Sequence, residues 1–231
     1  MDTDGHTLKR FDDELSALRE LVLRMGGGVE QQVAGAVAAL ARGDAVAARA
    51  IASRDRDIDR MELRADEAVA QLLALRAPLG VDLRTVLVLS KTVTDLERVG
   101  DEAKKIAKSA IRIHEAVTDP GAIPLLAEAQ ALADGAVGML RGALDALVRR
   151  ELERAAELDA EDDRLDAAYK AGVEALTRWM ATHPDGAGIA VQMVFVLKGL
   201  ERVGDHAKNI AEYVHYLVAG RDIRHPKSNS P

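Results

Sequence analysis

Two similar acidic strings occur along the chain, DLERVGD at 95–101 and GLERVGD at 199–205. In each string a glutamate is followed four residues later by an aspartate: Glu97 by Asp101, and Glu201 by Asp205. Residues four apart share one face of a helix, where two carboxylates repel each other by about 0.2–0.5 kcal/mol. We therefore expect positive charge beside each pair, either as bound cations or as lysine and arginine side chains.

A second acidic pair, Asp55 and Asp59, precedes the first string and belongs to the same hairpin. Asp59 and Glu97 are equally far in sequence from Pro78, where a turn is expected, and so are Asp55 and Asp101. Two antiparallel helices place such residues at the same height. The spacing therefore predicts that these four carboxylates face one another.

The same arrangement recurs in the second half of the chain, around a turn expected between His183 and Pro184. Asp166 and Glu201 are symmetric about this turn, and so are Asp162 and Asp205. The spacing predicts a second cluster of four carboxylates.

Four carboxylates in one or two helical turns need neutralisation, because a close pair repels by roughly 4 kcal/mol at 4 Å in a medium of effective dielectric near 20. Oxygen donors in a chain without cysteine suit Mg²⁺, Mn²⁺, Ca²⁺ or iron better than a structural zinc. Ion pairs at helical spacing are the alternative. The candidates are Asp101 with Lys104 or Lys105, Asp205 with Lys208, and Glu102 with Arg98.

Helices are expected throughout, because alanine, leucine, glutamate and arginine dominate and only 3% of residues are aromatic. Glycine, proline and aspartate divide the apolar periodicity into six segments. The expected helices span 8–41, 44–77, 80–116, 123–149, 151–182 and 187–219. The run Gly26-Gly27-Gly28 makes a kink or break possible inside the first helix.

The two halves of the chain are repeats. Superimposing LERVGD at 96–101 on 200–205 also aligns Ala103, Lys104 and Ile106 with identical residues in the second half. We therefore predict an all-α, elongated tandem of two antiparallel three-helix bundles. The expected domains are 1–118 and 119–220, followed by a polar tail at 221–231.

Composition restricts the functional classes. The chain has 231 residues and a formal net charge of −7, which disfavours a general nucleic-acid-binding surface. Its longest apolar run, at 189–197, is far shorter than the ~20 residues of a membrane span. The polar N-terminal stretch is not typical of a signal peptide, so we expect a cytoplasmic protein.

These motifs resemble those of the PhoU family. The likeness rests on both LERVGD strings, the four acidic pairs Asp55/Asp59, Glu97/Asp101, Asp162/Asp166 and Glu201/Asp205, VDLRTVL at 81–87 and YLVAGRDIRH at 216–225. It implies a cytosolic, non-catalytic regulator that damps phosphate-starvation signalling by linking the ATPase subunit of a phosphate transporter to a sensor histidine kinase. It also implies frequent dimerisation and multinuclear iron, zinc, or Mg²⁺/Mn²⁺ held by those eight acids.

Two other functions remain open from the residues alone: a carboxylate-bridged metal enzyme and a metal-free helical scaffold. Glu212 and His215 form one ExxH motif, whereas di-iron bundles need two, and the matching positions hold Lys108 and Ile111. The sequence contains no Gly-rich phosphate loop, nucleophile elbow or Ser/His/Asp arrangement.

Overall fold

The computed structural model describes residues 3–117 and 119–221, with the side chains of 3–8 and of Asp55 left out. In this part of the chain every regular element is a helix, which confirms the all-α prediction. The elements are α1 Thr3–Arg42, α2 Ala45–Ser53, α3 Asp55–Arg76, α4 Gly80–Ala116, η1 Pro120–Ala122, α5 Leu126–Arg149, α6 Leu152–Thr182, η2 Pro184–Gly186 and α7 Ala187–Ala219.

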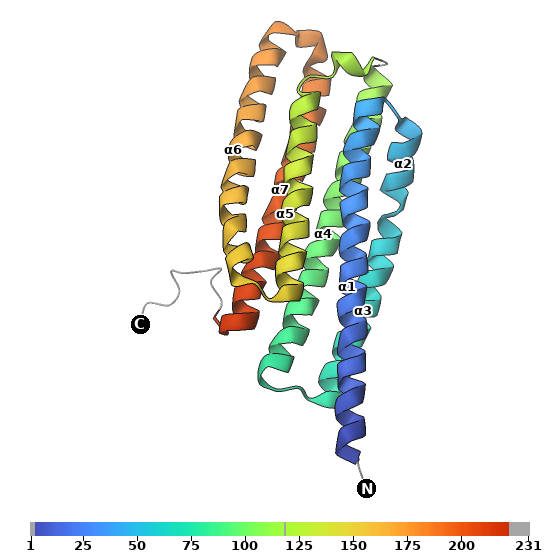
Figure 1. Ribbon diagram of the computed structural model, residues 1–231. Helices are drawn as coiled ribbons and strands as arrows, with labels where there is room; N and C mark the ends of the chain where they lie inside the picture. Colours follow the sequence, from blue (N-terminus) through green and yellow to red (C-terminus); the bar gives the residue numbers. More distant parts are fainter. Residues whose placement is uncertain (1–2, 118, 222–231) are drawn as a thin grey trace.

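The helices form one elongated bundle (Figure 1). α1, α2/α3 and α4 make up the first half, and α5, α6 and α7 make up the second. The halves join through α4 against α7 and through α1 against α5, and the α4–α7 contact is the most extensive in the structure. The predicted repeat of three-helix units is thus present, and the boundary at 118 stays a prediction because one apolar core runs through both halves.

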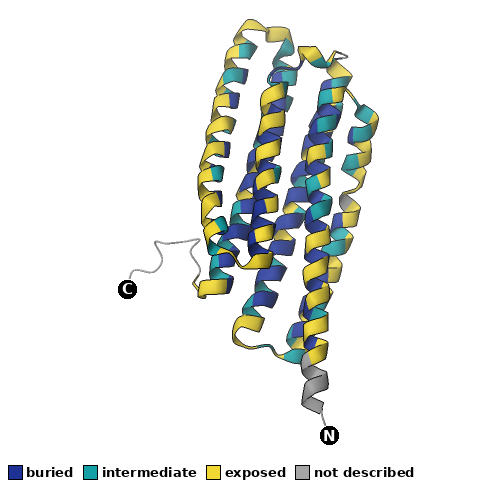
Figure 2. Cartoon of the chain, in the orientation of Figure 1, coloured by how far each residue is buried: buried dark blue, intermediate teal, exposed yellow. Residues whose placement is uncertain are grey.

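Burial follows the helical periodicity that defined the elements. Figure 2 shows buried faces turned inward and exposed faces turned to solvent, with α6 exposed along most of its outer side. α4 and α7 contribute long buried stripes that include Leu96, Ala103, Leu200 and Ala207. Within the described residues, no helix combines the length and apolarity that a membrane crossing requires.

The expected helix at 44–77 is instead two helices, α2 and α3, separated at Arg54. Asp44 caps α2, because its Oδ1 accepts a hydrogen bond from the Ala47 amide at 2.8 Å. At the break, the Gln32 side chain on α1 donates to the Arg54 carbonyl at 3.4 Å. A contact from another helix therefore accompanies this interruption, which contains neither glycine nor proline.

The glycine run in α1 does not break the helix, which continues from Thr3 to Arg42. Gly26 lies against Leu144 of α5 so closely that a Cβ would overlap it. A Cβ on Gly28 would lie 3.3 Å from Ile58 Cδ1 of α3. These two glycines let neighbouring helices approach α1, whereas Gly27 has nothing within 4 Å of its Cβ position.

Candidate functional site

In the second half, the acidic pairs of α6 and α7 lie at the same level of the hairpin. Leu165, which precedes Asp166, occupies the space that a Cβ on Gly204 would take, and Gly204 precedes Asp205. This contact agrees with the prediction, made from distances to the turn, that the acidic pairs of the two helices lie at the same height. Asp162 and Glu201 are buried, Asp166 is half-buried and Asp205 keeps an exposed edge.

Burial and the three neighbouring carboxylates both act on the pKa of Asp205. Desolvation raises the pKa of Asp205 above its ordinary value of 3.8, and the negative charges of Glu201, Asp162 and Asp166 raise it further. Lys198 opposes this shift. A raised carboxylate pKa marks a place where additional positive charge would be stabilised.

Two lysines supply part of that charge. Lys208 Nζ donates to Asp162 Oδ2 at 2.8 Å, and this hydrogen bond raises the pKa of Lys208. Lys198 Nζ donates to Glu201 Oε1 at 2.6 Å, and its pKa is raised although burial opposes the shift. The lysine expected beside Asp205 thus hydrogen-bonds to Asp162 on the neighbouring helix.

In the first half, Gly100 on α4 is equivalent to Gly204 and lies at the height of the first acidic cluster. A Cβ there would lie 3.4 Å from Ile58 Cγ2 of α3. Asp59, Glu97 and Asp101 are all half-buried, and Lys104 Nζ lies 3.8 Å from Asp101 Oδ1. The side chain of Asp55 lies outside the described residues, so the fourth member of this cluster is not placed.

The side chains of the two acidic clusters are of the chemical type that binds hard cations. Every candidate donor is a carboxylate oxygen, and the repulsion around Asp205 favours a bound positive ion. Among the described residues, however, no three or more His, Asp or Glu side chains are grouped so that they could already hold a metal ion. Lys198 Nζ contacts both carboxylate oxygens of Glu201, and Lys208 Nζ contacts one oxygen of Asp162.

A buried polar cluster that sequence reasoning missed joins α4 to α7. Asp95, only 5% exposed, accepts hydrogen bonds on Oδ2 from Tyr213 at 2.7 Å and on Oδ1 from Asn209 at 3.1 Å. His206 Nδ1 lies 2.8 Å from the same Oδ1. A signal was present in the sequence, because Asp95 is the first letter of DLERVGD and the second copy has Gly199 there.

Glu102 forms a second buried acidic contact between the same two helices. It is 3% exposed, and its Oε1 lies 2.9 Å from both Lys105 Nζ and Arg202 Nη1. Its partners thus include an arginine of the other half, whereas Arg98 of its own helix was the partner expected from spacing.

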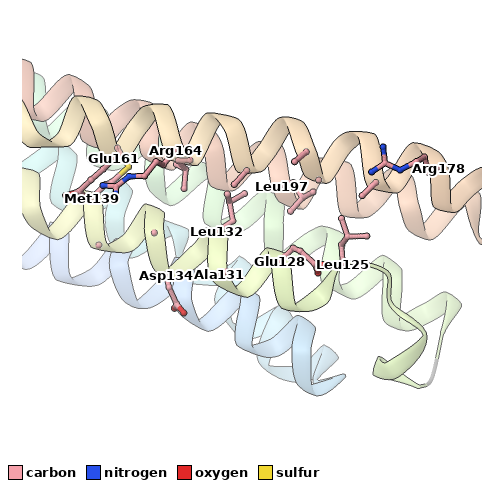
Figure 3. A pocket seen from close by; sticks show the side chains of 17 residues that line it. Leu125, Glu128, Ala131, Leu132, Asp134, Met139, Glu161, Arg164, Arg178 and Leu197 are labelled. Carbon is pink, nitrogen blue, oxygen red and sulfur yellow. The ribbon is translucent and has the colours of Figure 1, made fainter.

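A groove of ≈ 790 Å³ lies between α5 and α6, and Leu197 of α7 also lines it. Figure 3 shows Arg164 and Glu161 near one end and Arg178 near the other. Small residues such as Gly135 and Gly172 widen it. Its lining carries no hydroxyl, imidazole, amine or thiol side chain, and its polar members are carboxylates and guanidinium groups such as those of Glu161 and Arg164.

Comparison with known proteins agrees with the repeat. The PhoU domain family model matches twice, at 22–110 and 130–214. The chain is similar to the phosphate-specific transport system accessory protein PhoU homolog of Pseudomonas putida, 39% identical over 95% of this chain and 85% of that protein. It is 33% identical to the accessory protein PhoU of Escherichia coli K12, over 97% of this chain and 92% of the relative.

Solved structures show the same fold. The crystal structure of PhoU from Pseudomonas aeruginosa has a TM-score of 0.86 at 38% identity, covering 91% of this chain and 100% of that one. The regulatory protein PhoU from Streptococcus pneumoniae has a TM-score of 0.81 at 27% identity, covering 92% and 99%. The fold and the two family-model matches thus define a tandem three-helix-bundle protein of the phosphate transport accessory class. The chain belongs to the PhoU family.

Proposed function

We propose that this protein regulates phosphate uptake and phosphate-starvation signalling without catalysis, as an adaptor between the ATPase subunit of a phosphate transporter and a sensor histidine kinase. The observation that supports it is the similarity of nearly the whole chain, through both repeats, to phosphate transport accessory proteins. In this proposal the protein is cytoplasmic and forms a homodimer. Light scattering of the purified chain would test the homodimer.

The regulatory proposal predicts a change in gene expression. Deleting the gene from its host should derepress phosphate-uptake genes in phosphate-rich medium, because the negative signal would be lost. A transcriptional reporter measures this, and complementation with the wild-type gene is the control. Unchanged expression in the deletion strain contradicts a regulatory role, and failure of the protein to bind the isolated ATPase subunit contradicts the adaptor.

We also propose that the eight acids bind metal ions in two clusters. Asp55, Asp59, Glu97 and Asp101 would hold ions in the first half, and Asp162, Asp166, Glu201 and Asp205 in the second. A bound cation would neutralise the repulsion between these acids and fasten adjacent helices together. Iron, zinc, Mg²⁺ and Mn²⁺ are the candidate ions.

Asp205→Asn separates the metal proposal from simple ion pairing. Without metal it should stabilise the protein by about 0.2–0.5 kcal/mol, because a like charge four residues from Glu201 is removed. With metal it should lower both bound metal and the metal-dependent gain in stability. Elemental analysis and urea unfolding, with and without chelator, measure the two effects.

Asp163→Asn is the matched control, because Asp163 is exposed and adjacent to Asp162 but faces away from the cluster. It should change neither quantity. Equal metal content in wild type and Asp205→Asn would show that the second cluster is not a metal site.

A further inference from the structure

A pocket of ≈ 340 Å³ between α4 and α7 is lined largely by positive side chains. Lys105, Lys108 and Arg112 come from α4, and Lys198 and Arg202 come from α7. On α4 these residues recur at helical spacing, so they line the same side of the groove. We call this hollow the basic pocket.

The carboxylates of the basic pocket do not balance its cations. Glu102 contacts Lys105 and Arg202, and Glu201 contacts Lys198. Lys108 and Arg112 form no ion pair with any described residue. Five positive charges therefore face two negative ones, in a protein whose net charge is −7.

The internal repeat shows how the two sides of the α4–α7 contact differ in charge. In the repeat alignment Asp95 is equivalent to Gly199, and Lys105 is equivalent to Asn209. On one side of the α4–α7 contact, Asp95 supplies a buried carboxylate that neutral and histidine side chains contact. On the other side, Gly199 supplies no carboxylate: Ile106 and Glu102 of α4 lie against it, and Lys105 stands where the first side has the Asn209 amide.

We propose that the basic pocket binds a phosphate-bearing anion, either free inorganic phosphate or the phosphate of a larger molecule such as a lipid headgroup. The anion would lie in the part of the pocket that Lys108 and Arg112 line, beyond the Glu102 carboxylate that Lys105 and Arg202 contact. Arginine and lysine bind phosphate oxygens through charge-assisted hydrogen bonds, and Lys108 and Arg112 are free to do so. This inference follows from charge and shape and does not rest on the regulatory proposal.

The test is binding of inorganic phosphate to the full-length protein, measured by calorimetry and by amide chemical shifts at constant ionic strength. Wild type should bind saturably, with shifts confined to the pocket segments of α4 and α7. The double variant Lys108→Gln/Arg112→Gln should bind at least about tenfold more weakly, and Lys108→Glu should abolish binding. Lys9→Gln/Arg64→Gln, which removes two exposed cations elsewhere, is the matched control and should bind like wild type.

A second arm distinguishes the source of the phosphate. Vesicles of phosphatidylcholine with phosphatidic acid are compared with pure phosphatidylcholine, using the same variants. Vesicle binding that needs Lys108 and Arg112, without affinity for free phosphate, supports the site and assigns it to a headgroup. The proposal is overturned if neither probe binds, if Lys108→Gln/Arg112→Gln binds like wild type, or if chloride competes as well as phosphate.

Discussion

Asp95 forms a buried polar contact between the two halves. Its carboxylate accepts hydrogen bonds from Tyr213 and Asn209 and contacts His206, all on α7. Lys91 lies 5.6 Å from the Tyr213 ring centroid, which adds a cation–π contact on the same side. A buried polar network of this kind stabilises the protein only while each member keeps its partners.

Asp95→Ala should therefore lower the free energy of unfolding by about 3 kcal/mol, because buried donors on Tyr213 and Asn209 lose their acceptor. Asp95→Asn should cost less, since an amide oxygen can still accept. Urea unfolding followed by circular dichroism measures both. Asp145→Ala, at an exposed position of α5, should stay within about 0.5 kcal/mol of wild type, and a similar value for Asp95→Ala would refute the role given to this network.

At the residue scale, the sequence predicted part of the candidate site. Turn symmetry predicted that Asp162 and Asp166 lie level with Glu201 and Asp205, and the Leu165–Gly204 contact agrees with this. It could not predict that Lys208 contacts Asp162, because that contact joins two helices whose rotation depends on packing. For the same reason, periodicity alone gave no partner for Asp95.

At the scale of elements, helix positions were predictable and one interruption was not. Proline and glycine near residues 78, 120 and 184 mark turns through local chemistry, which a sequence displays directly. The break at Arg54 has no such residue and is accompanied by a contact from Gln32 of another helix. The glycines at 26–28 look like a break locally, but packing against Leu144 and Ile58 keeps α1 continuous.

Glycine substitutions test how closely the helices must approach. Gly27→Ala should stabilise the protein by up to about 1 kcal/mol, because alanine favours a helix and nothing lies within 4 Å of the new Cβ. Gly204→Ala should instead destabilise it by about 1 kcal/mol or more, because the Cβ overlaps buried Leu165. Thermal unfolding of the two variants compares them directly, and a stabilising Gly204→Ala would show that α6 and α7 have room to separate.

At the scale of the whole molecule, the two repeats share one core. Ile106 of α4 packs against Gly199 of α7, where a Cβ would lie 3.0 Å from Ile106 Cγ1. The same interface buries Asp95 and Glu102. Each half therefore needs the other to bury its apolar core.

Residues 1–118 expressed alone should therefore be much less stable than the full chain, because α4 would expose the apolar face that α7 now covers. Size-exclusion chromatography and urea unfolding measure this, and adding residues 119–231 as a separate polypeptide should restore a soluble complex. A monomeric fragment with a cooperative unfolding transition like that of the whole protein would show that the halves fold independently.

The α4–α7 contact is also selective about which partners it accepts. Glu102 stands at the position equivalent to His206, so two first halves meeting through this face would set Asp95 of one against Glu102 of the other. Two second halves would set Gly199 against His206, with no acid for the imidazole. Unlike halves match and like halves repel or leave polar groups unpaired, so the divergence of the two copies discriminates against pairing between identical repeats.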